Sequence, residues 1–163
     1  MKQLWAPWRM AYIDQNSKES GCVFCNKLDE SDPRHALVLA QTHYSVIMLN
    51  KYPYNNGHLL LAPKRHEKNL SALSIEEYGD LNEALRRSVD IVGRAFTPGG
   101  INLGMNLGKC AGAGIEDHLH WHVVPRWEGD TNFMPVTADT RVMPQHLLDS
   151  YDRLHHYFQN LSA

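Results

Sequence analysis

The sequence HLHWHVV, residues 118–124, places histidines at three alternate positions and ends in two valines. Side chains alternate between the two faces of a β-strand, so this pattern predicts a strand with all three imidazole rings on one face. Leu119, Trp121 and Val123 would then share the opposite face, which is the natural core face. Buried imidazoles need hydrogen-bond partners at their ring nitrogens, so packing alone does not explain this arrangement.

A single metal ion could not easily be shared by all three histidines. Residues i and i+2 of a strand can reach one ion, whereas residues i and i+4 lie about 13 Å apart along it. Three histidines do form some catalytic zinc sites, so a zinc-dependent hydrolase is one alternative interpretation. We instead expect three different roles, in which one ring anchors, the middle ring acts and the third assists.

The remaining sequence predicts one globular domain. The chain has 163 residues, of which 43% are hydrophobic and 21% charged, and its formal net charge is −2. This length can bury one core, and the charge gives no basic excess for nucleic-acid binding. No apolar segment reaches the roughly 20 residues that cross a bilayer, and the N-terminus lacks a signal segment. We expect a cytoplasmic protein with one domain over 1–163, including an N-terminal arm (1–20) and a C-terminal extension (128–163).

Apolar runs between turn-forming residues predict five strands, at 36–40, 44–49, 58–63, 101–108 and 119–127. A capping box of Ser74 and Glu77 begins a long helix. Its apolar stripe has helical spacing and consists of Ile75, Tyr78, Leu81, Leu85, Val89, Val92 and Phe96. A C-terminal helix is predicted over 144–160. The loops at 50–57 and 109–117 are too short for crossover helices, so we predict an α+β fold with an antiparallel five-stranded sheet.

The cysteines allow several interpretations. Cys22 and Cys25 form the motif CVFC, which has the spacing of half a zinc knuckle. Four-coordinate zinc needs two further ligands, so the motif alone does not complete a site. A redox pair and unpaired packing thiols are the alternatives.

Several motifs together resemble the histidine triad (HIT) superfamily. The pattern H-x-H-x-H followed by two apolar residues is similar to its histidine triad, and NNGHLLLAPKRH (55–66) is similar to its G-H-x-L-x-x-P-K-x-H segment. CVFC and GMNLG (104–108) lie where members carry equivalent segments. The resemblance covers residues 20–127 and implies a HIT-like fold. The segments 4–13 and 125–136 resemble the bacterial branch that includes diadenosine tetraphosphate phosphorylases.

The resemblance implies nucleotidyl transfer through a covalent intermediate on the middle histidine, His120. A neutral imidazole is nucleophilic at pH 7, and attack at an α-phosphorus would divide one displacement into two. His122 would orient the α-phosphate. Inorganic phosphate as acceptor gives a phosphorylase of dinucleoside polyphosphates. Water gives a hydrolase of dinucleoside polyphosphates or nucleoside phosphoramidates, and a nucleotide-binding scaffold with weak turnover is a further alternative.

Other ligand-binding positions also follow from the resemblance. Asn50 matches the position that binds the ribose, and Asn106 matches one on the α-phosphate side. Small residues in the loop before the triad, namely Gly112, Ala113 and Gly114, let backbone N–H groups approach phosphate. Many members carry a polar side chain where this chain has Gly114 and Ile115. We therefore expect the loop backbone, helped by Asn132, to contact phosphates and to influence the choice of acceptor.

The resemblance also completes the zinc site. It adds His66 and His118 to Cys22 and Cys25, which gives a closed structural Zn²⁺ site and assigns His118 as the anchor. It further implies a homodimer. The arm containing Trp5, Trp8 and Arg9 could contact the nucleotide or pack in a dimer.

Overall fold

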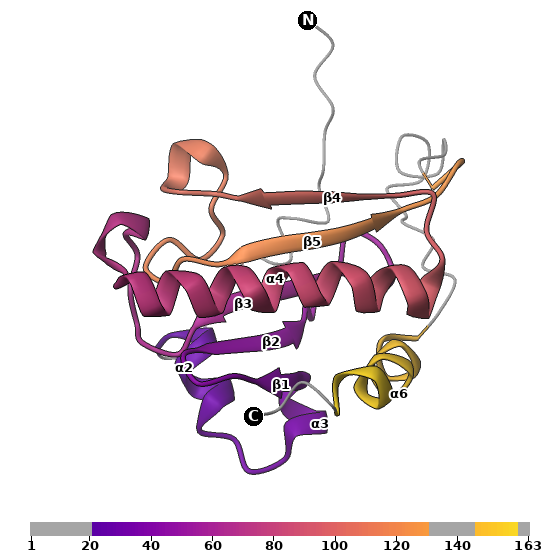
Figure 1. Ribbon diagram of the computed structural model, residues 1–163, viewed down its shortest axis with the longest axis horizontal. Coiled ribbons are helices and arrows are strands. Elements are labelled where there is room, and N and C mark those ends of the chain that lie inside the picture. The colour runs from indigo at the N-terminus through magenta and orange to yellow at the C-terminus, as the bar shows by residue number, and fades with distance from the viewer. Residues whose placement is uncertain (1–20, 131–145, 160–163) are drawn as a thin grey trace, which may run out of the picture.

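The computed structural model describes residues 21–130 and 146–159, which contain a five-stranded sheet (Figure 1). The strand order is β1-β2-β3-β5-β4, and every neighbouring pair is antiparallel. The strands are β1 (Val38–Gln41), β2 (Ser45–Leu49), β3 (Leu59–Pro63), β4 (Gly100–Met105) and β5 (Trp121–Arg126). The predicted α+β fold with a five-stranded antiparallel sheet is confirmed.

Helices pack on both faces of this sheet. The long helix α4 (Ile75–Phe96) runs across one face in Figure 1 and contacts β2, β3 and β5. The C-terminal helix α6 (Leu147–Phe158) packs against α4 and β1. The short helices α2 (Val23–Leu28) and α3 (Pro33–Ala36) contact each other, and α3 also contacts β1. Within the described ranges, no helix has the length and apolar character needed to cross a membrane.

The structure adds short helices that were not predicted, and some predicted strand boundaries differ from the observed ones. CVFC begins helix α2, because Cys22 is its N-cap residue and Val23 its first residue. The strand predicted over 101–108 ends at Met105, and the chain then turns through the 3-10 helix η2 (Lys109–Ala111). A second 3-10 helix, η1 (Leu70–Ala72), precedes α4.

A further difference concerns the triad segment itself. β5 begins at Trp121, where it pairs with Leu61, so His118 and His120 precede the β-ladder. The ladder stops because β3 ends in Pro63, which has no N–H group to donate to the next residue of a partner strand.

The apolar stripe of α4 is confirmed from Leu81 onward. The predicted members in the core are Leu81, Leu85, Val92 and Phe96, with Val89 partly buried against them. The prediction was wrong for the first turn, where Ile75 is 87% exposed and Tyr78 is 46% exposed. These residues follow the helix spacing but precede the part of the helix that meets the sheet. The capping box is confirmed, since Ser74 Oγ accepts the Glu77 N–H and the Glu77 carboxylate accepts the Ser74 N–H.

Each face of the sheet has its own apolar core. Side chains of α4 and α6 pack on one face with alternate strand residues such as Ile47, Leu61 and Val123. On the other face, Phe24 of α2 packs against Val46, Met48, Leu60 and Ala62. Consecutive residues of β2 and β3 therefore belong to different cores, as the alternation of a strand requires.

Gly57 shapes the connection between β2 and β3. Its φ of +73° lies in the left-handed region, and a Cβ atom here would lie 2.6 Å from Cε2 of Phe96. The Asn50 N–H closes the connection by donating to the His58 carbonyl oxygen at 2.9 Å. The end of α4 thus packs directly against the turn that presents His58.

We expect Gly57→Ala to lower the free energy of unfolding by about 2 kcal/mol or more, because it adds both backbone strain and a clash with Phe96. Urea denaturation would measure the change. The matched control is Gly79→Ala in α4, where a Cβ atom meets nothing within 4 Å. That variant should gain roughly 0.5–1 kcal/mol, because alanine favours the helix. A Gly57→Ala protein as stable as the wild type would contradict this role.

Candidate active site

The three histidines lie on the face of the sheet away from α4. The ring centroids of His120 and His122 are 4.9 Å apart. The buried Phe24 ring lies 4.9 Å from His118 and 5.0 Å from His120, and it belongs to the core on that face. Leu119, between them, packs in the opposite core. The alternation predicted for this segment therefore extends beyond the β-ladder.

His118 is fully buried, and both of its ring nitrogens have partners. A carbonyl oxygen can only accept, so Nε2–H donates to Pro63 at 2.8 Å. This leaves Nδ1 unprotonated and 3.2 Å from Cys22 Sγ. Burial lowers the pKa of His118 to about 4, so the ring is neutral at pH 7. The lone pair on Nδ1 is therefore directed at the thiol, in the form that binds a metal.

The residues predicted as metal ligands lie together. One ligand atom from each of Cys22, Cys25, His66 and His118 lies within 4.8 Å of the others. Cys25 Sγ is 3.5 Å from His66 Nδ1 and 3.9 Å from His118 Nδ1. Tetrahedral zinc, with bonds of roughly 2.0–2.3 Å, holds ligand atoms about 3.3–3.8 Å apart. The four side chains therefore fit a zinc ion after small adjustments.

The surroundings of Cys25 favour its protonated form. Burial, together with the hydrogen bond of the Cys25 thiol to Cys22 and the charge of Cys22, raises the pKa of Cys25. A metal ion would reverse this effect, because a coordinating thiol loses its proton. Cys22 is the N-cap residue of α2, Cys25 lies within α2, His66 follows β3 and His118 precedes β5. The cluster thus joins three segments that are distant in the sequence.

The ring of His120 is fixed by the backbone of its neighbour. His120 is 4% exposed, and its Nδ1–H donates to the His118 carbonyl oxygen at 2.8 Å. Burial lowers the pKa of His120 more than this hydrogen bond raises it. The ring is therefore neutral at pH 7, with its lone pair on Nε2. A neutral imidazole in this tautomer can act as a nucleophile through Nε2.

A chain of hydrogen bonds sets the tautomer of His122. The Tyr54 backbone N–H donates to Nδ1 of the buried His58 at 3.0 Å, so His58 carries its proton on Nε2. Nε2 of His58 lies 3.0 Å from Nδ1 of His122. His122 therefore accepts at Nδ1 and carries its own proton on Nε2. In this tautomer Nε2 is a hydrogen-bond donor.

The predicted phosphate-binding loop lies beside Asn106. Asn106 Nδ2 donates to the Gly112 carbonyl oxygen at 3.4 Å. The backbone N–H groups of Ala111, Gly112 and Ala113 already donate to carbonyl oxygens within the loop. An incoming phosphate could share these groups only as a second acceptor. Of the loop positions predicted to bind phosphate, Gly114 is therefore the one best suited to donate.

Of the remaining predicted ligand-binding residues, Asn50 lies within the described structure and Asn132 does not. Asn50 follows β2, where its Oδ1 accepts the Tyr52 N–H at 2.9 Å and its Nδ2 lies 3.3 Å from His58 Nδ1. It therefore lies beside the hydrogen-bond chain that leads to His122. Asn132 and the arm of residues 1–20 lie outside the described residues.

Two residues of the site were not identified from the sequence. Phe24 lies between the two cysteines of CVFC and packs on both His118 and His120, so its position inside the motif was an available signal. Tyr54 acts through its backbone N–H, which no residue type reveals. Its ring also stacks near His122, at 5.9 Å between centroids and 17° between planes.

Known proteins resemble this chain in both sequence and fold. The family model "HIT domain" matches residues 32–129. The AP-4-A phosphorylase of Mycobacterium tuberculosis (strain ATCC 25618 / H37Rv) is 35% identical in an alignment that covers 92% of this chain and 80% of the relative. The bis(5'-adenosyl)-triphosphatase of Dictyostelium discoideum is 33% identical over 97 residues, which are 60% of this chain and 64% of that protein.

A solved structure shares the fold. The Zn-bound histidine triad family protein from Mycobacterium smegmatis superposes with a TM-score of 0.68 at 23% identity. The superposition covers 86% of this chain and 95% of that chain.

We expect His58→Leu to release His122 from its Nε2–H tautomer, because the variant lacks the donor that Nδ1 accepts. A hydrogen bond worth about 1 kcal/mol biases a tautomer equilibrium roughly fivefold. His58→Gln is the matched control, because its amide can donate from a position close to that of Nε2. Long-range ¹H–¹⁵N NMR of the imidazoles would report the tautomer. An unchanged His122 signal in His58→Leu would rule out the relay.

Proposed function

This chain belongs to the HIT family, and from that premise we propose that it cleaves dinucleoside polyphosphates by transferring a nucleotidyl group through His120 to inorganic phosphate. The observation that carries the proposal is the state of the His120 ring. Its Nδ1–H is bonded to the His118 carbonyl oxygen, and burial keeps the ring neutral. The ring is thus ready to attack through Nε2 without first losing a proton.

In the first step, Nε2 of His120 attacks the α-phosphorus. An N–P bond forms while the bond from that phosphorus to the bridging oxygen breaks. With diadenosine tetraphosphate, ATP leaves and AMP is bound to the ring. Nδ1 keeps its proton, and the His118 carbonyl oxygen stabilises the positive charge that develops on the imidazole.

In the second step, a phosphate oxygen attacks the same phosphorus. The N–P bond breaks, its electron pair returns to Nε2, and ADP leaves with one proton released to solvent. His120 regains its neutral form. The two steps divide one difficult displacement between an intermediate and a second acceptor, which is the advantage of nucleophilic catalysis.

The neighbouring side chains supply hydrogen bonds to the transferred group. His122, held as a donor at Nε2 by His58, is suited to an oxygen of the α-phosphate. We assign Asn50 to the ribose, and Asn106 and the Gly114 N–H to the phosphates, with Gly112 and Ala113 as further backbone contacts. Asn132 is proposed as an additional phosphate contact.

Two of the sequence alignments bear on the choice of acceptor. The one that covers more of this chain favours phosphate. The AP-4-A phosphorylase of M. tuberculosis aligns with 92% of this chain, whereas the triphosphatase of D. discoideum aligns with 60%. The second similarity supports a hydrolase as the alternative, with water in place of phosphate.

The four-residue cluster is proposed to hold a structural zinc ion. Two thiolates and two imidazoles, from Cys22, Cys25, His66 and His118, suit zinc in both type and spacing. The ion would supply a cross-link between α2, the end of β3 and the triad segment. It would also fix His118, whose carbonyl oxygen orients the nucleophile.

We also propose that residues 1–163 form one domain and that two chains form a homodimer. The single domain is supported by α6, whose Tyr151, Leu154 and Phe158 lie in the same core as α4. The homodimer is supported by the edge strand β4, where Leu103 is 49% exposed. Sedimentation equilibrium would test the association.

We expect diadenosine tetraphosphate to be converted to ADP and ATP only when phosphate is present. Chromatography of the products would show this directly, and ¹⁸O-labelled phosphate should place its label in ADP. AMP formed equally well without phosphate would identify a hydrolase and contradict the proposed acceptor.

In the same assay, His120→Ala should lose at least about 10³-fold in turnover while still binding nucleotide. His43→Ala, which removes an exposed histidine outside the site, is the matched control and should retain wild-type turnover. Normal turnover by His120→Ala would exclude the covalent route.

Elemental analysis of protein purified without chelator should give about one zinc per chain, as expected for a closed structural site. Cys22→Ser should lose that zinc and lower the Tm by roughly 5 °C or more, because the metal stabilises only the folded chain. Cys110→Ser removes an exposed thiol outside the cluster and should change neither quantity. Equal zinc content in the Cys22→Ser and wild-type proteins would refute the assignment.

A further inference from the structure

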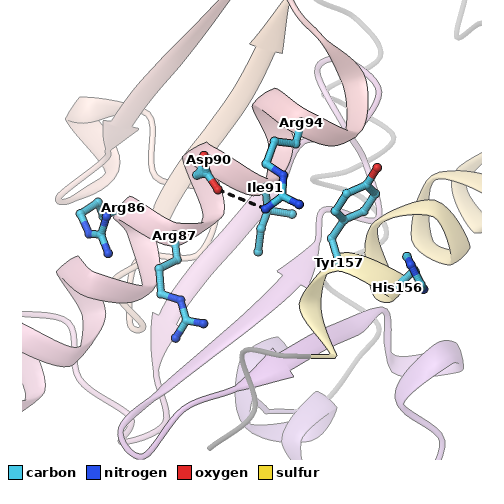
Figure 2. Close-up of a pocket in the computed structure, with 7 residues that line it drawn as sticks. All are labelled: Arg86, Arg87, Asp90, Ile91, Arg94, His156 and Tyr157. Atoms are coloured by element: carbon cyan, nitrogen blue, oxygen red, sulfur yellow. Dashed lines mark ion pairs between the residues drawn. The ribbon is translucent and has the colours of Figure 1, made fainter.

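Ion pairs on the surface of α4 differ from a shielded polar network that follows β5. In the pocket between α4 and α6, Figure 2 shows Arg94 beside Asp90, and these side chains are 66% and 67% exposed. Exposed pairs of this kind contribute little to a structure. The Asp130 carboxylate is only 11% exposed and accepts several hydrogen bonds. Such a network restricts the segments that it joins.

Asp130 closes the turn that follows β5. Its Oδ1 accepts a hydrogen bond from Arg126 Nη2 at 2.8 Å, and its Oδ2 accepts one from Arg126 Nε at 2.6 Å. Oδ2 also accepts the Trp127 N–H at 3.1 Å, and the Asp130 N–H donates to the Trp127 carbonyl oxygen at 3.2 Å. The two-point contact with Arg126 fixes the carboxylate relative to β5, the strand that carries His122.

Asn55, in the connection between β2 and β3, joins this network from the other side. It is 7% exposed, and its Nδ2 donates to Asp130 Oδ2 at 2.7 Å and to the Pro125 carbonyl oxygen at 3.0 Å. A carboxylate and a carbonyl oxygen can only accept, which fixes the orientation of the amide. The β3–β5 ladder ends at Leu59 opposite Val123, so Asn55 attaches the connection to β5 beyond the ladder.

The backbone of the same residue holds His58. The His58 N–H donates to the Asn55 carbonyl oxygen at 3.2 Å, and the preceding residue, Tyr54, supplies the N–H that His58 Nδ1 accepts. His58 Nε2 then lies 3.0 Å from Nδ1 of His122 on β5. The contacts are therefore continuous from β5 through Asn55 to His58 and back to β5. A movement of the connection away from β5 would lengthen the bond between the two imidazole rings.

We propose that Asn55 and Asp130 are positioning residues, which hold His58 close enough to His122 to set the tautomer of that ring. The consequence for turnover rests on the proposed function, in which His122 donates to the α-phosphate. The consequence for the tautomer does not, because it requires only the folded chain.

Asn55→Asp keeps the shape of the side chain but replaces Nδ2 with an oxygen, which then faces the Asp130 carboxylate and the Pro125 carbonyl oxygen. Long-range ¹H–¹⁵N NMR of the full chain should show the His122 equilibrium shifted at least about fivefold away from the Nε2–H tautomer, as for the loss of one hydrogen bond. With diadenosine tetraphosphate and phosphate, kcat should fall at least about tenfold while KM changes less than about twofold, because a hydrogen bond that strengthens in the transition state contributes to kcat.

Asp130→Ala is a milder second variant, because Asn55 keeps the Pro125 carbonyl oxygen as an acceptor. It should shift the His122 tautomer in the same direction by a smaller factor. Asn102→Ala is the matched control, since the exposed Asn102 accepts a hydrogen bond from Arg126 Nη1 at 3.1 Å and so contacts the network at its outer end. This control should change neither the tautomer nor kcat.

An unchanged His122 tautomer in Asn55→Asp and Asp130→Ala, or an equal shift in Asn102→Ala, would overturn the inference. If Asn55→Asp does not fold, the Asp130→Ala spectrum decides alone. A wild-type protein that does not turn over diadenosine tetraphosphate would refute the proposed function, whereas the tautomer shift would still support the positioning role.

Discussion

The geometry of the site depends on the His118 ring, which is fully buried and bonded at both nitrogens. Nε2–H joins it to Pro63 at the end of β3, and Nδ1 joins it to Cys22 at the start of α2. Leaving either nitrogen without a partner in this environment would cost about 1–3 kcal/mol. The ring can therefore occupy few positions. Since its own carbonyl oxygen holds His120, the anchor also sets the position of the nucleophile.

Backbone groups decide where the protons of the triad lie. The Pro63 carbonyl oxygen sets the tautomer of His118, and the His118 carbonyl oxygen sets that of His120. The Tyr54 N–H sets that of His122 through His58. The middle ring then presents a lone pair at Nε2, while the last ring presents a proton at Nε2. Neighbouring rings of one residue type thus acquire opposite hydrogen-bonding roles through their tautomers.

Local patterns predicted the features that depend on neighbouring residues along the chain. The alternation of residues 118–123 and the capping box at Ser74 are of this kind, because a strand or a helix start is visible within a few positions. The exposure of Ile75 and Tyr78 could not be predicted in this way, since it depends on where α4 meets the sheet. The start of β5 depends similarly on its pairing with β3.

The same distinction between local patterns and long-range contacts applies to the residues of the site. His66 and His118 could be added to the cysteines only through resemblance to a family, because 52 positions separate them in the chain and nothing in their spacing joins them. The role of His58 was not predictable, because it depends on a backbone N–H that reaches the ring across a turn. The position of Phe24 inside CVFC was a signal, but its contacts with two of the triad rings depend on the fold of α2 onto the sheet.

Side chains of the triad segment alternate between the two faces of the sheet. Packing on the face that contacts α4 therefore affects the position of the histidine rings on the other face. Leu119 and Val123 are buried against α4, and the rings of His118, His120 and His122 project from the same short backbone. Protein cores are close-packed, so a shift of Leu119 cannot be absorbed without moving its neighbours. A misplacement of about 1 Å in a reacting group can cost roughly a hundredfold in rate. The long helix thus contributes to the site without contacting it, because its packing holds the segment from which the nucleophile extends.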